Sequence, residues 1–192
     1  MKKRLRVTSC LLLLLLIALY GCTSAEKKAK ADEIAELQRM SSSASDMGIV
    51  VSAGTTKLEY SRRLTDALLK FGDRNSDCRQ TMTHFHATEE EPVALEACQH
   101  LNKAMDAYVF AQDYFGLIPD PTDPAVLSST LTEDEYAKAK LRFARLTELA
   151  PAETNEYGYK FYSRDAMVQA LWKVATQEFE AANTQIEKLS AQ

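Results

Sequence analysis

The sequence contains few glycines and none of the short motifs that accompany enzyme active sites. Only six of its 192 residues are glycine, which leaves little room for loops that wrap closely around a ligand. The chain has no glycine-flanked nucleophilic serine, no phosphate-binding glycine loop, no paired His-Glu zinc helix and no haem-attachment motif. We therefore expect that the protein is not an enzyme and that it uses no cofactor.

The first 22 residues have the layout of a removable export signal. Four basic residues stand near its start: Lys2, Lys3, Arg4 and Arg6. An apolar run over 11–19 follows, which is too short to span a bilayer as a mature helix. The run ends in Leu19-Tyr20-Gly21-Cys22, which resembles the lipobox of bacterial lipoproteins: Leu, a variable residue, a small residue and Cys. Tyr20 departs from the small or β-branched residue usual at its position.

This resemblance covers only the leader, and it implies where the protein resides. In the lipoprotein family, the Cys after the cleavage site receives a diacylglycerol thioether and its freed amine is commonly acylated, for instance with palmitate. Cys22 would therefore carry the lipid. Two or three acyl chains hold a protein on a membrane essentially permanently, because each buried methylene contributes about 0.8 kcal/mol. Thr23 stands where many inner-membrane lipoproteins have Asp, which favours the outer membrane, with the domain facing the periplasm.

Two other interpretations of the leader stay open at this stage. An ordinary secretory signal requires small residues at one and three positions before the cut, and no convincing pair lies near Gly21. An uncleaved membrane anchor is the second alternative.

The chain also lacks a basic patch. Cleavage after Gly21 would remove four basic and no acidic residues, and so change the formal net charge from −4 to −8. An acidic surface repels nucleic acid, so we expect no nucleic-acid partner. The charge could form an acidic face for a basic protein, although the simpler interpretation is that it keeps the domain dispersed.

Composition divides the chain into three segments. We predict a signal peptide over 1–21, a lipidated Cys with a flexible tether over 22–45, and an α-helical domain over 46–192. The tether is rich in Lys, Glu, Ala and Ser, and its apolar residues Ile34, Leu37 and Met40 form a stripe too narrow to dock firmly alone. The remainder suits one domain with one core.

Apolar residues recur at helical spacing through most of that domain. Four main helices are expected over about 52–71, 92–115, 132–150 and 163–192, with a short one over 78–86. Gly72 supplies a stop, Pro92 suits a first turn, and Thr132 with Glu135 forms a capping box. Ser163 is expected to cap the last helix. We predict an all-α fold: a helical bundle of about four main helices plus a short one, after a flexible N-terminal tether.

One segment, Tyr157 to Tyr162, does not fit this pattern. Its alternation of aromatic residues is compatible with a short strand or an aromatic loop. We favour aromatics packed under a loop, while an exposed aromatic recognition patch is the alternative, since such residues are frequent at interface hot spots.

Two cysteines, Cys78 and Cys98, are predicted to form a disulfide. If 78–86 and 92–115 are antiparallel helices, Cys78 lies nine residues before the connection and Cys98 seven residues after it, at nearly matching depth. Both belong to apolar stripes, and an exported protein faces an oxidising compartment. Closure of this loop should stabilise the fold by about 3 kcal/mol.

The three histidines fit a shared metal site poorly. His84 and His86 are two residues apart, so on a helix they would point in nearly opposite directions, and His100 is expected level with Cys78. If the segment 84–90 were extended, His84 and His86 would align beside Glu89–Glu91. They are the only metal candidates, and we expect no metal.

The sequence therefore predicts a lipid-anchored, periplasm-facing lipoprotein whose helical domain binds another protein. The settings considered are envelope or secretion machinery, or neutralisation of a toxic effector. The alternative is a small-ligand or metal carrier that uses the bundle interior or His84 and His86.

Overall fold

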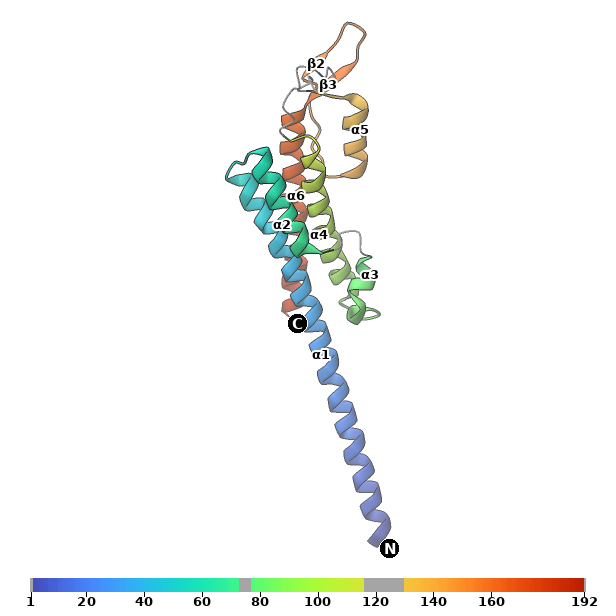
Figure 1. The fold of residues 1–192 in the computed structure, drawn as a ribbon. Coiled ribbons are helices and arrows are strands. Elements are labelled where there is room, and N and C mark those ends of the chain that lie inside the picture. Colours follow the sequence, from blue (N-terminus) through green and yellow to red (C-terminus); the bar gives the residue numbers. More distant parts are fainter. Residues whose placement is uncertain (1, 73–76, 116–129, 192) are drawn as a thin grey trace.

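The computed structural model describes residues 2–72, 77–115 and 130–191, and their side chains from Ser24 onward. The described helices are α1 (Lys2–Ser52), α2 (Lys57–Phe71), α3 (Cys78–Thr81), α4 (Glu91–Gln112), α5 (Glu133–Arg142) and α6 (Arg164–Ser190). A 3-10 helix, η1 (Thr83–Phe85), lies between α3 and α4. The described strands are β1 (Thr130–Thr132), β2 (Glu153–Thr154) and β3 (Lys160–Ser163). The predicted helical bundle is confirmed, with a small sheet added (Figure 1).

Helices α4 and α6 form the centre of the bundle and make the most extensive contact between described elements. Their contact surface combines alanines with larger apolar residues, and Leu101, Met105 and Leu171 have no exposed surface. Helices α1 and α2 form a hairpin that packs beside this pair (Figure 1). The core is therefore shared by helices far apart in the sequence.

Local signals set the helix ends as expected. The hydroxyls of Thr56, Thr132 and Ser163 each accept a backbone N–H of the first turn that follows, and Glu135 completes the capping box. Gly72 ends α2 at a φ of +87°, a conformation that glycine adopts without strain. Its backbone N–H donates a hydrogen bond to the carbonyl of Leu68.

Helix α1 continues through 22–45, the segment expected to be a flexible tether, and past residue 46, where the helical domain was expected to begin. Leu37, Met40, Ala44 and Met47 lie on one face of α1 and are 0–3% exposed within the core. The serines that suggested a linker are accommodated in the helix. Ser43 donates to the carbonyl of Arg39, and Ser41 donates to Asn183 Oδ1 on α6 over 2.6 Å. The stripe docks firmly because it continues to Met47, about two helical turns beyond the three residues predicted.

Two helices are shorter than predicted. The segment 78–86 forms only α3 and η1, yet Cys78, Met82 and Phe85 are buried as expected. Helix α5 ends at Arg142 instead of near Pro151, because Phe143 turns to an extended conformation with φ −120° and ψ 93°. Phe143 and Leu146 then reach the core from an irregular segment.

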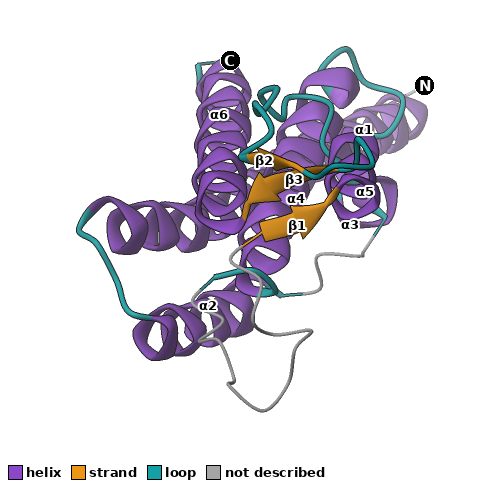
Figure 2. Cartoon of the chain, turned by 90° about the horizontal axis from the view of Figure 1, so that it is seen from above, coloured by secondary structure: helices purple, strands orange, loops and turns teal. Residues whose placement is uncertain are grey.

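We favoured a loop for Tyr157–Tyr162. This prediction was wrong for the second half of the segment, which belongs to β3. This strand is the centre of an antiparallel sheet with the order β1-β3-β2, in which Leu131 pairs with Tyr162 and Thr154 pairs with Lys160. Tyr162 is buried and stacks on Tyr136 of α5 at 4.1 Å between ring centroids. Packing against α5 thus gives the strand a buried face. Figure 2 shows the sheet lying over the end of the helices.

Candidate functional site

The predicted lipidation residue, Cys22, lies in α1 but outside the residues whose side chains are described. Figure 1 shows the N-terminal part of α1 extending away from the other helices. Within the described residues, no helix is both long and apolar enough to cross a membrane.

Cys78 and Cys98 lie at disulfide-bonding distance, as predicted from their spacing. Their Cα atoms are 5.8 Å apart, and the pair joins α3 to α4. Cys98 is fully buried, and Asn102 Nδ2 lies 3.3 Å from the Cys78 sulfur. This pair anchors one side of the segment that carries His84 and His86, and its role there is structural.

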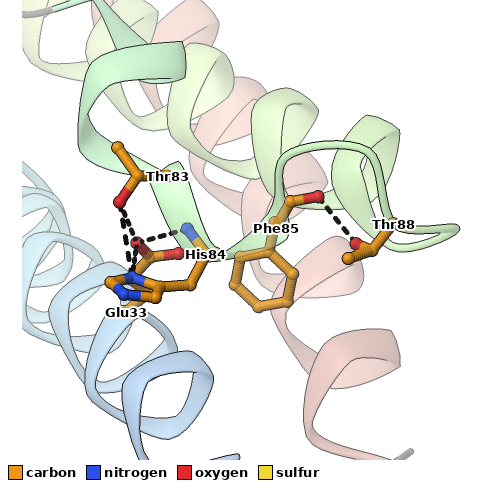
Figure 3. A network of polar contacts seen from close by, with 5 residues as sticks. All are labelled: Glu33, Thr83, His84, Phe85 and Thr88. Atoms are coloured by element: carbon orange, nitrogen blue, oxygen red, sulfur yellow. Dashed lines mark hydrogen bonds and ion pairs between the residues drawn. The ribbon is translucent and has the colours of Figure 1, made fainter. Parts of the chain in front are cut away.

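The other side of that segment is held by Glu33 of α1 (Figure 3). The Oε1 atom of Glu33 accepts hydrogen bonds from the His84 backbone N–H at 3.0 Å and from the Thr83 hydroxyl at 3.1 Å. It also lies 2.8 Å from His84 Nδ1. Glu33 is 9% exposed, and this burial ties η1 to α1 across 51 residues of sequence.

The neighbouring Thr83, His84 and Glu33 do not form a nucleophilic triad. In a triad the carboxylate and the hydroxyl contact opposite nitrogens of the imidazole. Here Glu33 and Thr83 both approach Nδ1, at 2.8 and 3.3 Å respectively. His84 therefore cannot take a proton from Thr83 through one nitrogen while Glu33 orients it through the other.

The two metal candidates are not brought together into a site. His86 is exposed at the end of η1, and His84 Nδ1 is occupied by Glu33. Among the described residues, no group of three or more His, Cys, Asp or Glu side chains is placed to hold a metal ion.

His100 belongs to a second carboxylate-centred cluster, on α6. The carboxylate of Glu178 is 5% exposed and lies between two basic side chains. Its Oε2 is 2.5 Å from His100 Nδ1, and its Oε1 is 3.2 Å from Arg145 Nε. The cluster joins α4, α6 and the segment after α5, and it compensates the cost of burying Glu178.

An exposed, hydrogen-bonded turn joins β2 to β3; we call it the hairpin tip and define it as residues 155–159. Asn155 organises it. Its backbone N–H donates to the carbonyl of Tyr159, and its own carbonyl accepts from Gly158, both at 3.0 Å. Its side-chain Oδ1 accepts from the N–H groups of Tyr157 and Tyr159, also at 3.0 Å. Gly158 has a φ of +84°, as expected for a three-residue hairpin loop.

The hairpin tip presents two tyrosines to solvent. Tyr157 is 77% exposed and Tyr159 is 65% exposed, whereas most large apolar and aromatic side chains of the described residues are covered. An exposed aromatic patch was among the interpretations of the sequence here, but the role of Asn155 was not predicted. The spacing Asn155-x-x-Gly158 is itself a turn signal, because Asn favours the first position of a type I turn and Gly the fourth.

Comparisons with known proteins give no assignment: no protein-family model matches the chain, and no curated protein or solved structure is significantly similar to it. The fold and the candidate site therefore rest on the residues themselves. They define a disulfide-linked helical bundle with an exposed, hydrogen-bonded aromatic turn at one end.

Proposed function

We propose that the protein is a lipid-anchored lipoprotein of the bacterial envelope, and that its helical domain is a non-enzymatic module that binds another protein. Lipid on Cys22 would hold it on the outer membrane, with the domain facing the periplasm. The candidate settings are envelope or secretion machinery, or neutralisation of an effector.

The course of α1 supports an anchor that also orients the domain. Cys22 and the core residue Leu37 lie on the same helix, and Glu33 binds the segment next to α4. Glu33 lies eleven positions after Cys22 on the same helix, which is about 16 Å at the usual rise per residue. A lipid at Cys22 would therefore hold the α3 end of the bundle near the membrane.

The observation that carries the proposal is the position of the hairpin tip. It lies at the end of the molecule opposite the N-terminus of α1 (Figure 1), where a membrane anchor would leave it free. The turn that carries its two exposed tyrosines makes four hydrogen bonds with Asn155, three through the tyrosine backbone and one through Gly158. A rigid loop loses little conformational entropy on binding, and tyrosine is enriched among the residues that dominate interfaces.

The histidines support a non-enzymatic role. His84 and His100 each contact a mostly buried carboxylate that links separate elements. In both clusters the contact holds two elements of the fold together. Neither cluster places a hydroxyl on one imidazole nitrogen and a carboxylate on the other.

Lipidation and partner binding are tested separately. Cells that express the wild type or Cys22→Ala are labelled with a palmitate analogue and fractionated. We expect the label and the membrane association in the wild type only. Cross-linked complexes are then purified from solubilised membranes. Native protein in the cytosol with residues 1–21 intact would overturn the anchor, and recovery of no partner under several growth conditions would overturn the binding role.

A small-ligand carrier is a second candidate, favoured by one observation. A groove of about 530 Å³ lies between α1 and α2, with Met47 and Ala67 buried in it and Ile49 and Leu69 exposed at its rim. Calorimetry with zinc, with copper and with a fatty acid would test this function. Saturable binding that is abolished by Ile49→Asp, a substitution at the exposed rim of the groove, would favour it over the protein-binding role.

A further inference from the structure

The surroundings of the hairpin tip are acidic. Glu153 precedes the tip and Glu156 lies within it, and both residues are exposed. Among the described residues, neither carboxylate has an ion-pair partner. The nearest basic side chain on the hairpin, Lys160, lies 3.9 Å from Glu133 of α5, which balances its charge. The tip and Glu153 in the strand before it therefore combine two exposed aromatic side chains with two carboxylates that have no ion-pair partner among the described residues.

Strand addition is a poor way for a partner to use this hairpin. The outer strand, β2, has only two residues, Glu153 and Thr154. A short edge strand with an exposed charge discourages pairing with another strand. The N–H groups of Tyr157, Gly158 and Tyr159 already donate to Asn155, which leaves few backbone donors in the tip, so a partner would mainly contact side chains.

From this combination we propose that the hairpin tip is a docking site for a Lys- or Arg-rich segment of a partner protein. The faces of Tyr157 and Tyr159 attract cations, and an arginine can stack on a tyrosine ring while it pairs with a carboxylate. Glu153 and Glu156, which are close to both tyrosines in the sequence and exposed, would supply those carboxylates. The negative charge expected for the cleaved chain, −8, would steer a basic partner toward it. This inference rests on the proposed function and specifies its partner.

The test measures binding of a fluorescent nine-arginine peptide to the lipidated full-length protein in detergent, at low and at physiological salt. The double variant Tyr157→Ser/Tyr159→Ser should weaken binding about tenfold, since each exposed cation–ring contact is modest. Phe at both positions keeps the rings and should stay within about twofold of the wild type. Glu153→Gln/Glu156→Gln should weaken binding and reduce its salt dependence.

Two matched controls separate this site from general attraction to an acidic protein. Glu180→Gln/Glu187→Gln removes the same charge from exposed positions on α6, and Leu58→Ser changes a side chain on α2 that is 82% exposed. Neither should change the affinity by more than about twofold. The docking site would be overturned if the two Glu-to-Gln double variants lost equal affinity for the peptide. It would also be overturned if the Ser double variant bound the peptide as well as the wild type. Tip-dependent binding of peptidoglycan fragments without binding of the arginine peptide would overturn it as well.

Partner capture from solubilised membranes distinguishes a failure of the docking site from a failure of the proposed function. If the Ser double variant recovers the same partner as the wild type, the tip is not the docking site and the proposed function stands. If neither protein recovers a partner, the proposed function itself fails. If only the Ser double variant loses a partner, and that partner cross-links to the wild type through a Lys- or Arg-rich peptide, both the docking site and the proposed function are supported.

Discussion

The indole N–H of Trp172 donates a hydrogen bond to the hydroxyl oxygen of Tyr60 over 3.1 Å, inside the bundle. The Tyr60 hydroxyl in turn donates to the carbonyl of Tyr108 over 2.7 Å. Three helices, α2, α4 and α6, are thus joined by one chain of hydrogen bonds. The rings of Tyr60 and Trp172 also contact the ring of Phe115. The centroid of Phe115 lies 5.2 Å from that of Tyr60 and 5.1 Å from that of Trp172.

Tyr60→Phe should lower the free energy of unfolding by about 1–3 kcal/mol, because it leaves the buried Trp172 N–H without its acceptor and removes a second hydrogen bond to the Tyr108 carbonyl. Urea denaturation followed by circular dichroism measures this. Tyr157→Phe removes the hydroxyl of an exposed tyrosine and should change stability by less than about 0.5 kcal/mol. Equal effects of the two substitutions would contradict the buried network.

Stability should fall as the pH rises above about 10. Burial raises the pKa of Tyr108 to about 12 from its ordinary value of 10.0, and burial likewise raises the pKa of Tyr60. Above pH 10 the unfolded chain therefore loses protons that the folded chain retains, which favours unfolding. The stabilisation from the neutral phenols is complete below pH 10 and decreases between pH 10 and 12 for Tyr108. Denaturation at a series of alkaline pH values checks this, and Tyr108→Phe should make the decrease shallower.

Removal of the disulfide through Cys78→Ala/Cys98→Ala should cost about 3 kcal/mol, as expected for the 20-residue separation. The loss arises mainly from the greater freedom of the unfolded chain. Reduction of the wild type should cause a similar change, measured by denaturation with and without reductant. Thiol labelling of denatured, unreduced protein should find neither Cys78 nor Cys98 reactive, and labelling of both would contradict the pairing.

Leu37→Ala tests whether α1 is part of the core before residue 46. Leu37 has no exposed surface, so its truncation should cost about 2–5 kcal/mol. Leu58→Ala, at an exposed position on α2, is the matched control and should cost less than about 0.5 kcal/mol. If Leu37→Ala were equally neutral, this part of α1 would behave as the tether that composition predicted.

Much of the fold could be predicted from neighbouring residues. Thr132 and Glu135 are three residues apart, and Ser163 lies directly before its helix, so these caps depend on local hydrogen bonds. The disulfide could be predicted because Cys78 and Cys98 flank one short connection. The early end of α5 could not be predicted in this way, because Phe143 leaves the helix and its ring contacts that of Phe110 on α4.

The candidate site was less predictable, because its parts belong to different elements. Tyr157 and Tyr159 were recognised as aromatic, but the sequence could not distinguish them from the buried Tyr162. That difference depends on Tyr136, which stacks on Tyr162.

By itself, the sequence determined the helical character, the helix caps and the disulfide pairing, since each depends on spacing along a short stretch of chain. Only the tertiary structure decided that α1 packs into the core, that Glu33 contacts His84, and which tyrosines remain exposed. The physical reason is that burial depends on contacts between residues distant in sequence, such as Ser41 with Asn183. A local pattern can show that a residue is apolar or aromatic, but only the packed helices and strands determine what covers it.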